Sequence, residues 1–155
     1  MMKYFGDRVW GCFMLNEFFE STKSMMKEES SIDPFQYSPL VLAYIGDAVY
    51  ELYIRSMLVL KGNAPVHTLH KKAILLVKAK AQSDIAHRIQ PMLSEEEYAI
   101  FKRGRNAKSA HVPKNADVNE YRHATGFETL VGYLYLKGEM HRIQELFMSA
   151  LEQYI

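Results

Sequence analysis

One long apolar segment, residues 38–62, constrains the fold of this chain more than any other feature. It reads SPLVLAYIGDAVYELYIRSMLVLKG. Ser38 followed by Pro39 is typical of a helix start, because a serine oxygen can cap free amide groups and proline fits the first helical turn. Gly62 is the matching stop signal. Apolar residues occur on nearly all sides of the predicted helix, so we expect it to be the central helix and to be surrounded on nearly all sides.

An acidic residue interrupts this apolar helix. Asp47 lies near its middle, where an ionised carboxylate loses hydration unless a cation or hydrogen-bond donors replace the water. A second apolar segment, residues 118–137, repeats the pattern with Glu128, and Gly126 and Gly132 lie where another backbone could approach closely. If the two helices cross, the carboxylates converge, and such a pair raises one pKa or recruits a divalent cation. Hard oxygen ligands favour Mg²⁺ or Mn²⁺ over zinc.

Other interpretations of these acidic residues stay open at this point. Asp47 could accept a hydrogen bond from a tyrosine hydroxyl, and Glu128 could reach solvent at the edge of its helix. Glu51, one turn after Asp47, is either a further metal ligand or the i+4 partner of Arg55.

A different metal site is suggested by the Glu-x-x-His pattern of helical di-iron proteins. Glu120 and His123 form one such pair, and Asp84 with His87 imitates a second. A di-iron bundle needs two such pairs and two further glutamates on facing helices. We therefore expect His123 to be a half-exposed residue on a helix rather than a metal ligand.

Length and patterning predict one all-α domain. The chain has 155 residues, of which 48% are hydrophobic, enough for one core and too few for two ordinary domains. No strand-like alternation persists along the sequence. The predicted helices that follow the central one span residues 68–89, 94–101, 118–137 and 140–155. We expect an N-terminal extension over residues 1–37, with a connector at 26–34, and a helical domain over 38–155.

Basic residues are concentrated in one part of a nearly neutral chain. The formal net charge is +1, yet residues 67–115 hold ten lysines and arginines against four acidic residues. This asymmetry indicates a surface that binds a polyanion. A long basic loop, RGRNAKSAHVPKN, is predicted over residues 103–115. The candidate contacts to nucleic acid are Lys102, Arg103, Arg105, Asn106, Lys108, Lys114 and Asn115.

Composition also predicts the compartment. The single cysteine excludes an internal disulfide, and no apolar run approaches the length that spans a bilayer. The N-terminus lacks the pattern of a secretory signal. We expect a cytoplasmic protein without membrane contact.

Several motifs resemble one nuclease family. GDAVYEL after LAYI, and ATGFETLVGYLYL later in the chain, resemble the two signature helices of the ribonuclease III endonuclease domain. LHKKA, EEEYAIFKRGRNAKS and PKNADVNEYRHATGFE resemble its compact bacterial form, Mini-ribonuclease III, which lacks the appended double-stranded-RNA-binding domain. The similarity covers residues 39–151, whereas residues 1–30 match nothing in the family.

The resemblance implies an all-α homodimeric endoribonuclease that cuts both strands of duplex RNA with Mg²⁺, for which Mn²⁺ substitutes, and leaves 5′-phosphate ends. By motif position, Asp47 and Glu128 are its catalytic and metal-binding carboxylates. Ala43 and Thr125 stand where the larger enzymes of the family carry further carboxylates. One well-held ion is therefore expected rather than a fully occupied two-metal site.

The resemblance also implies a substrate and a partner. The expected substrate is the precursor of large-subunit (23S) ribosomal RNA, and a ribosomal protein is a possible helper. The alternative is a catalytically inert RNA-binding or ribosome-assembly protein on the same scaffold. Retention of both Asp47 and Glu128 favours the enzyme, because apolar residues at these positions would stabilise an inert scaffold.

Overall fold

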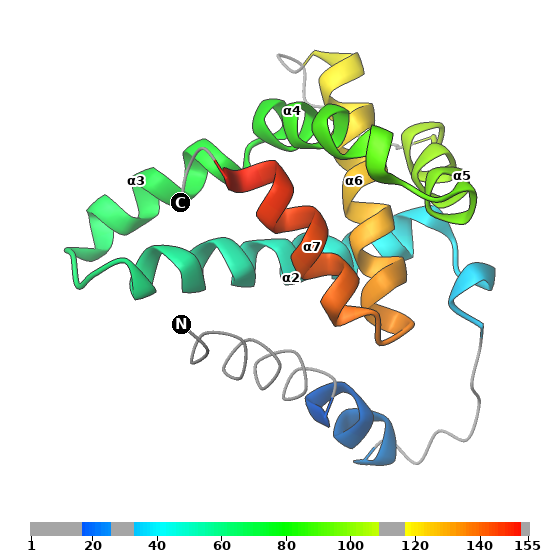
Figure 1. Ribbon diagram of the computed structural model, residues 1–155, viewed down its shortest axis with the longest axis horizontal. Helices are drawn as coiled ribbons and strands as arrows, with labels where there is room; N and C mark the ends of the chain where they lie inside the picture. The colour runs from blue at the N-terminus through cyan, green and yellow to red at the C-terminus, as the bar shows by residue number, and fades with distance from the viewer. Residues whose placement is uncertain (1–16, 26–32, 109–116, 153–155) are drawn as a thin grey trace, which may run out of the picture.

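The computed structural model describes residues 17–25, 33–108 and 117–152 (Figure 1). The described residues form helices and no strand, which confirms the all-α prediction. Residues 17–25 are helical and precede the main domain. The elements that follow are η1 (Pro34–Gln36), α2 (Pro39–Leu60), α3 (Val66–Val77), α4 (Ala79–Ile89), η2 (Gln90–Met92), α5 (Glu95–Arg105), α6 (Val118–Leu136) and α7 (Met140–Leu151).

Most helix ends lie where the capping residues predict them. The side chain of Ser38 caps α2, Ser94 and Glu97 form a capping box on α5, and Asp117 accepts from two amides at the start of α6. Gly138, just after α6, has a φ of 77°, a conformation that favours glycine. These helix ends could be predicted from the sequence because a cap is a contact between residues close in sequence.

The predicted helix over residues 68–89 is wrong, because two helices occupy this segment. Lys78 has extended backbone (φ −64°, ψ 151°) and separates α3 from α4. The first of them begins at Val66 after Pro65, so Thr68 is not its cap. The apolar periodicity runs on through the break, which is why the sequence did not reveal it. Figure 1 shows the two helices running in different directions.

Helix α6, rather than α2, is the most buried element. It packs against α2, α4 and α5, and residues along most of its length are buried. The expectation that α2 is enclosed on nearly all sides is wrong for the single chain, since one face of it is exposed. The exposed apolar residues of that face, here called the α2 face, are Leu40, Val41, Tyr44, Leu52, Val59 and Leu60.

The two apolar helices approach each other through glycines. A Cβ on Gly46 of α2 would overlap the carbonyl oxygen of Glu128, and a Cβ on Gly132 of α6 would overlap that of Leu42. Only glycine permits this backbone separation. The close crossing places the residue after Gly46, which is Asp47, beside the turn of α6 that carries Glu128.

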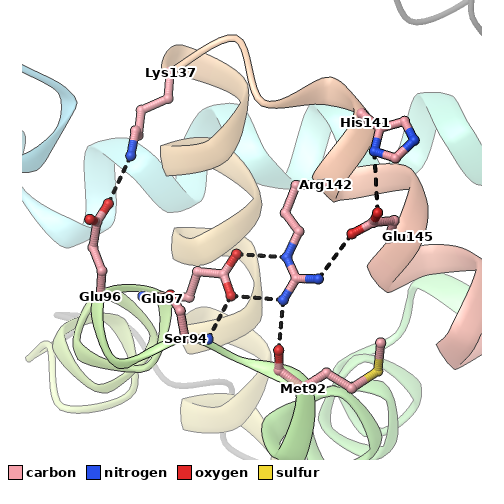
Figure 2. A network of polar contacts seen from close by, with 8 residues as sticks. All are labelled: Met92, Ser94, Glu96, Glu97, Lys137, His141, Arg142 and Glu145. Carbon is pink, nitrogen blue, oxygen red and sulfur yellow. Dashed lines mark hydrogen bonds and ion pairs between the residues drawn. The ribbon is translucent and has the colours of Figure 1, made fainter.

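A polar network joins α5 to α6 and α7 (Figure 2). Arg142 donates to both carboxylate oxygens of Glu97, at 2.8 and 3.0 Å, while the backbone amide of Ser94 also donates to Glu97. Lys137 donates to Glu96 at 2.8 Å. The cavity of about 390 Å³ among these residues is lined by Glu139 and by three carboxylates that already have cationic partners, Glu96, Glu97 and Glu145. We assign this network to fold stability.

The N-terminal helix contacts the domain. The ring of Phe19 packs against that of Tyr135 on α6, with 5.2 Å between centroids. Lys23 lies over the Phe19 ring at 4.5 Å. The described part of the extension is thus packed on the helical domain, while most of the predicted connector, residues 26–32, lies outside the described residues.

Candidate active site

The carboxylates predicted to converge do so. Asp47 of α2 and Glu128 of α6 line one cavity of about 470 Å³. Asp47 is exposed in the single chain and Glu128 is half-buried. Tyr44 and Tyr121 form part of the rim of this cavity. The close helix crossing at Gly46 is the local reason that one side chain from each helix reaches the same opening.

The two carboxylates are electrostatically coupled. Burial, and next the negative charge of Asp47, raise the pKa of Glu128 to about 8. Partial burial, and next the charge of Glu51, raise the pKa of Asp47. Hydrogen bonding from the side chain of Gln82 opposes both shifts. A carboxyl group whose pKa is raised by burial and by a neighbouring carboxylate is typical of a functional site.

Gln82 of α4 is a site residue that sequence reasoning missed. Its side chain is 1% exposed, and its Nε2 donates to the carbonyl of Val77 at 3.1 Å. A buried amide on an amphipathic helix carries no distinctive sequence signal. For Asp47 the sequence left a tyrosine donor open, and the structure provides a side-chain hydrogen bond from Gln82.

Two further positions of the cavity explain its small number of acidic groups. Ala43 and Thr125, where the resemblance implies carboxylates in the larger enzymes, line the same cavity as Asp47 and Glu128. Thr125 donates its hydroxyl hydrogen to the carbonyl of Tyr121 at 3.1 Å. These positions contribute a methyl group and a hydroxyl group in place of negative charge.

A second cavity, of about 460 Å³, adjoins the first. The two share Tyr121 and Thr125. Its other lining residues include Asn106 and Lys108, both candidates from the sequence, and Arg122. Sequence reasoning missed Arg122, because its separation of six residues from Glu128 is less than two helical turns and does not place the two side chains on one face of the helix. The adjoining cavities bring the carboxylate pair next to positive charge.

The other predicted basic contacts have different surroundings. Helix α5 continues to Arg105, so Lys102, Arg103 and Arg105 lie on a helix end rather than in the predicted loop. Arg103 donates to the backbone carbonyls of Phe35 and Tyr37, at 2.8 and 2.9 Å, and thereby holds η1 against α5.

The remaining candidates are less constrained. Lys102 is exposed and lies over the ring of Tyr98 at 4.9 Å, and Arg105 donates to the side chain of Asn106 at 3.3 Å. Lys114 and Asn115 lie outside the described residues.

The alternative acidic and histidine patterns do not form a metal centre in the described part of the chain. Glu51 pairs with Arg55 at 2.8 Å. The rings of His87 and His123 stack, with 4.5 Å between centroids, and His123 is 9% exposed rather than half-exposed. No group of three or more His, Cys, Asp or Glu in residues 17–25, 33–108 and 117–152 is placed to hold a metal ion.

The fold and the site define a class of helical nuclease. The model of the Ribonuclease III domain family matches residues 40–139, a span that contains both carboxylates. The chain belongs to the ribonuclease III domain family, and it is an endoribonuclease that acts on double-stranded RNA.

Curated relatives place the chain near one branch of this family. It is 50% identical to Mini-ribonuclease 3 of Thermoanaerobacter sp. (strain X514), over 88% of this chain and 95% of the relative. It is also 50% identical to Mini-ribonuclease 3 of Brevibacillus brevis, over 81% of this chain and 94% of the relative. The crystal structure of protein FN1578 from Fusobacterium nucleatum is similar, with a TM-score of 0.72 and 35% identity, covering 81% of this chain and 100% of that one.

Among the described residues, no helix combines the length and apolar character needed to cross a bilayer.

Proposed function

We propose that this chain is a Mg²⁺-dependent endoribonuclease that cuts both strands of duplex RNA as a homodimer, with Asp47 and Glu128 as its catalytic, metal-binding residues. The observation that carries the proposal is the cavity in which these carboxylates, one from each of two closely crossing helices, lie next to a second cavity lined by Lys108 and Arg122. A cation and a polyanion thus have adjoining binding surfaces.

The residues present fit a hard divalent cation. Asp47 and Glu128 offer carboxylate oxygens, which Mg²⁺ prefers, and Mg²⁺ commonly takes its other ligands from water and substrate phosphate. When bound, the ion lowers the pKa of a water molecule and draws charge from the scissile phosphate. The chain's own residues orient that reaction. The two carboxylates would hold the ion, and the adjoining positive charge would align the RNA backbone.

The exposed α2 face supports a homodimer. Tyr44 is 84% exposed and Leu60 is 86% exposed, and the two lie at opposite ends of the face. Six large apolar side chains exposed along one helix support an interface there. A second copy related by a two-fold axis would cover it and supply a second carboxylate pair. Two sites are what cutting two strands requires.

The basic surface next to the carboxylates would contact RNA through its backbone. We propose Lys102, Arg105, Asn106 and Lys108 from the sequence candidates, with Arg122 added. Lys114 and Asn115 stay candidates on the sequence alone. Arg103 stays a candidate as well, but its hydrogen bonds to η1 leave it less available than its neighbours. Recognition through phosphates and 2′-hydroxyls selects the shape of the duplex more than its sequence.

The biological substrate is proposed to be the precursor of large-subunit ribosomal RNA, cut in the cytoplasm, with a ribosomal protein as a helper. Names of the curated relatives support this choice only to the level of a ribonuclease. The test is to map the 23S termini in cells that lack the gene. Unprocessed ends are expected, and mature ends would refute the assignment. Addition of purified ribosomal proteins to the cleavage assay tests for the helper.

Cleavage of a long RNA duplex tests the enzyme directly. The wild type with Mg²⁺ should yield short duplex products with 5′-phosphate ends, whereas Asp47→Asn and Glu128→Gln should bind the duplex and leave it intact. Glu51→Gln is the matched control, since Glu51 is the nearby carboxylate that is paired with Arg55. A wild type that binds duplex and never cuts it would establish an inert RNA-binding protein instead.

A further inference from the structure

One side chain of helix α4, that of Gln82, interacts with both carboxylates of the site and has no role in the proposed reaction. Gln82 is 1% exposed. Hydrogen bonding from its side chain acts on both Asp47 and Glu128. A third helix therefore reaches the point where α2 and α6 bring their acidic groups together.

The break at Lys78 explains how this glutamine is held. Helix α3 ends at Val77, so the carbonyl of this residue has no amide of its own helix as a partner. The Nε2 of Gln82 donates to the Val77 carbonyl at 3.1 Å, and this hydrogen bond fixes the position of the amide nitrogen. The backbone amide of Gln82 donates to the carbonyl of Lys78 at 3.1 Å. The residue is thus anchored at both its backbone and its side chain.

The other end of the amide has no partner. Among the described residues, Gln82 Oε1 is the buried side-chain oxygen or nitrogen for which no hydrogen bond is found. Buried polar atoms are almost always paired, so an unpaired one calls for a functional explanation. If the residue served packing alone, a leucine or methionine would fill the space without this cost. The amide that carries this oxygen also hydrogen-bonds to Asp47 and Glu128, and an amide oxygen is a hard acceptor that an ion or its hydration shell can use.

We propose that Gln82 is the positioning residue of this site, which holds Asp47 and Glu128 toward a single divalent cation. This inference rests on the metal site of the proposed function. A neutral amide suits the role, because it donates to a carboxylate without adding positive charge. A lysine or arginine in its place would neutralise the pair and compete with the ion. Gln82 thus compensates for the carboxylates absent at Ala43 and Thr125 by ordering the two that remain.

Binding of Mn²⁺ to the full chain without RNA tests this role, followed by the electron paramagnetic resonance signal of free Mn²⁺. Gln82→Met keeps the length and removes the amide, and we expect its Mn²⁺ affinity to fall at least about tenfold, as for other residues that orient metal ligands. Gln144→Met, on a half-buried glutamine of α7 that lines neither cavity, is the matched control and should bind like the wild type. Affinity of Gln82→Met within twofold of the wild type would overturn the proposal.

A second variant covers the case in which Gln82→Met does not fold. Gln82→Glu places a third carboxylate beside the pair, so Mn²⁺ should raise its unfolding temperature by more than it raises that of the wild type. An equal or smaller increase would show that position 82 does not face the ion, and would overturn the proposal.

Asp47→Asn separates the two levels of inference. If this variant binds Mn²⁺ as the wild type does, the proposed metal site fails, and the role of Gln82 fails with it. If it loses binding while Gln82→Met keeps it, only the role of Gln82 fails. In the cleavage assay, a positioning role predicts that Gln82→Met lowers kcat and leaves KM for the duplex unchanged.

Discussion

Replacing Glu128 by glutamine should make the metal-free protein more stable in alkaline solution. The site raises the pKa of this carboxyl from 4.5 to about 8. The folded chain therefore retains a proton that the unfolded chain releases between these values, so the free energy of unfolding falls as pH rises from 4.5 to about 8. One pKa unit corresponds to about 1.4 kcal/mol, which limits the total loss to about 5 kcal/mol. The variant cannot ionise and avoids this loss.

Urea unfolding followed by circular dichroism measures the effect. Both proteins are compared with EDTA at one protomer concentration, because stability is coupled to any dimerisation. Near pH 5 the two should have similar stability, and near pH 9 the variant should exceed the wild type by several kcal/mol. Parallel pH profiles for the two proteins would refute the argument that Glu128 is held protonated by its surroundings. Added Mg²⁺ should stabilise only the wild type at alkaline pH, since the variant lacks one of the two ligands.

Four further outcomes are expected. Gly46→Ala should lower the free energy of unfolding by about 3 kcal/mol or more, measured by urea titration, because its methyl group overlaps backbone of α6. Paired replacement of Arg105 and Lys108 by alanine should weaken binding to all duplexes alike and reduce the salt dependence by about one unit per lost phosphate contact, measured by filter binding. Arg103→Ala should lower the melting temperature, because its guanidinium holds η1, and should reduce that salt dependence by less than the paired replacement does. Arg142→Met should cost about 2–3 kcal/mol of stability by leaving Glu97 unpaired, again measured by urea titration.

The parts of the fold that depend on neighbouring residues could be predicted from sequence. Ser38, Ser94 and Asp117 each cap a helix within three residues of themselves, so three helix starts were correct. The isolated carboxylates Asp47 and Glu128 were visible because charge is rare in an apolar helix. The glycines beside them indicated a close approach, and the structure has one.

The errors have a common physical cause. Apolar periodicity shows which side of a helix is buried, but it does not reveal a single residue with extended backbone. The break at Lys78 was therefore missed. The basic segment also did not show that Arg103, which stays a candidate RNA contact, donates hydrogen bonds to Phe35 and Tyr37, far away in the sequence. Periodicity also left open whether a second copy of the chain or the domain itself covers the α2 face.

The sequence by itself determined the helical class, the main helix starts and the two acidic side chains around which the site is built, because caps and isolated charges act within one or two turns. Tertiary structure alone decided that Glu128 has its pKa raised, that Gln82 joins the pair from a third helix and that Arg122 lies beside it. Each of these depends on the register between packed helices, which is set by the fit of side chains distant in sequence.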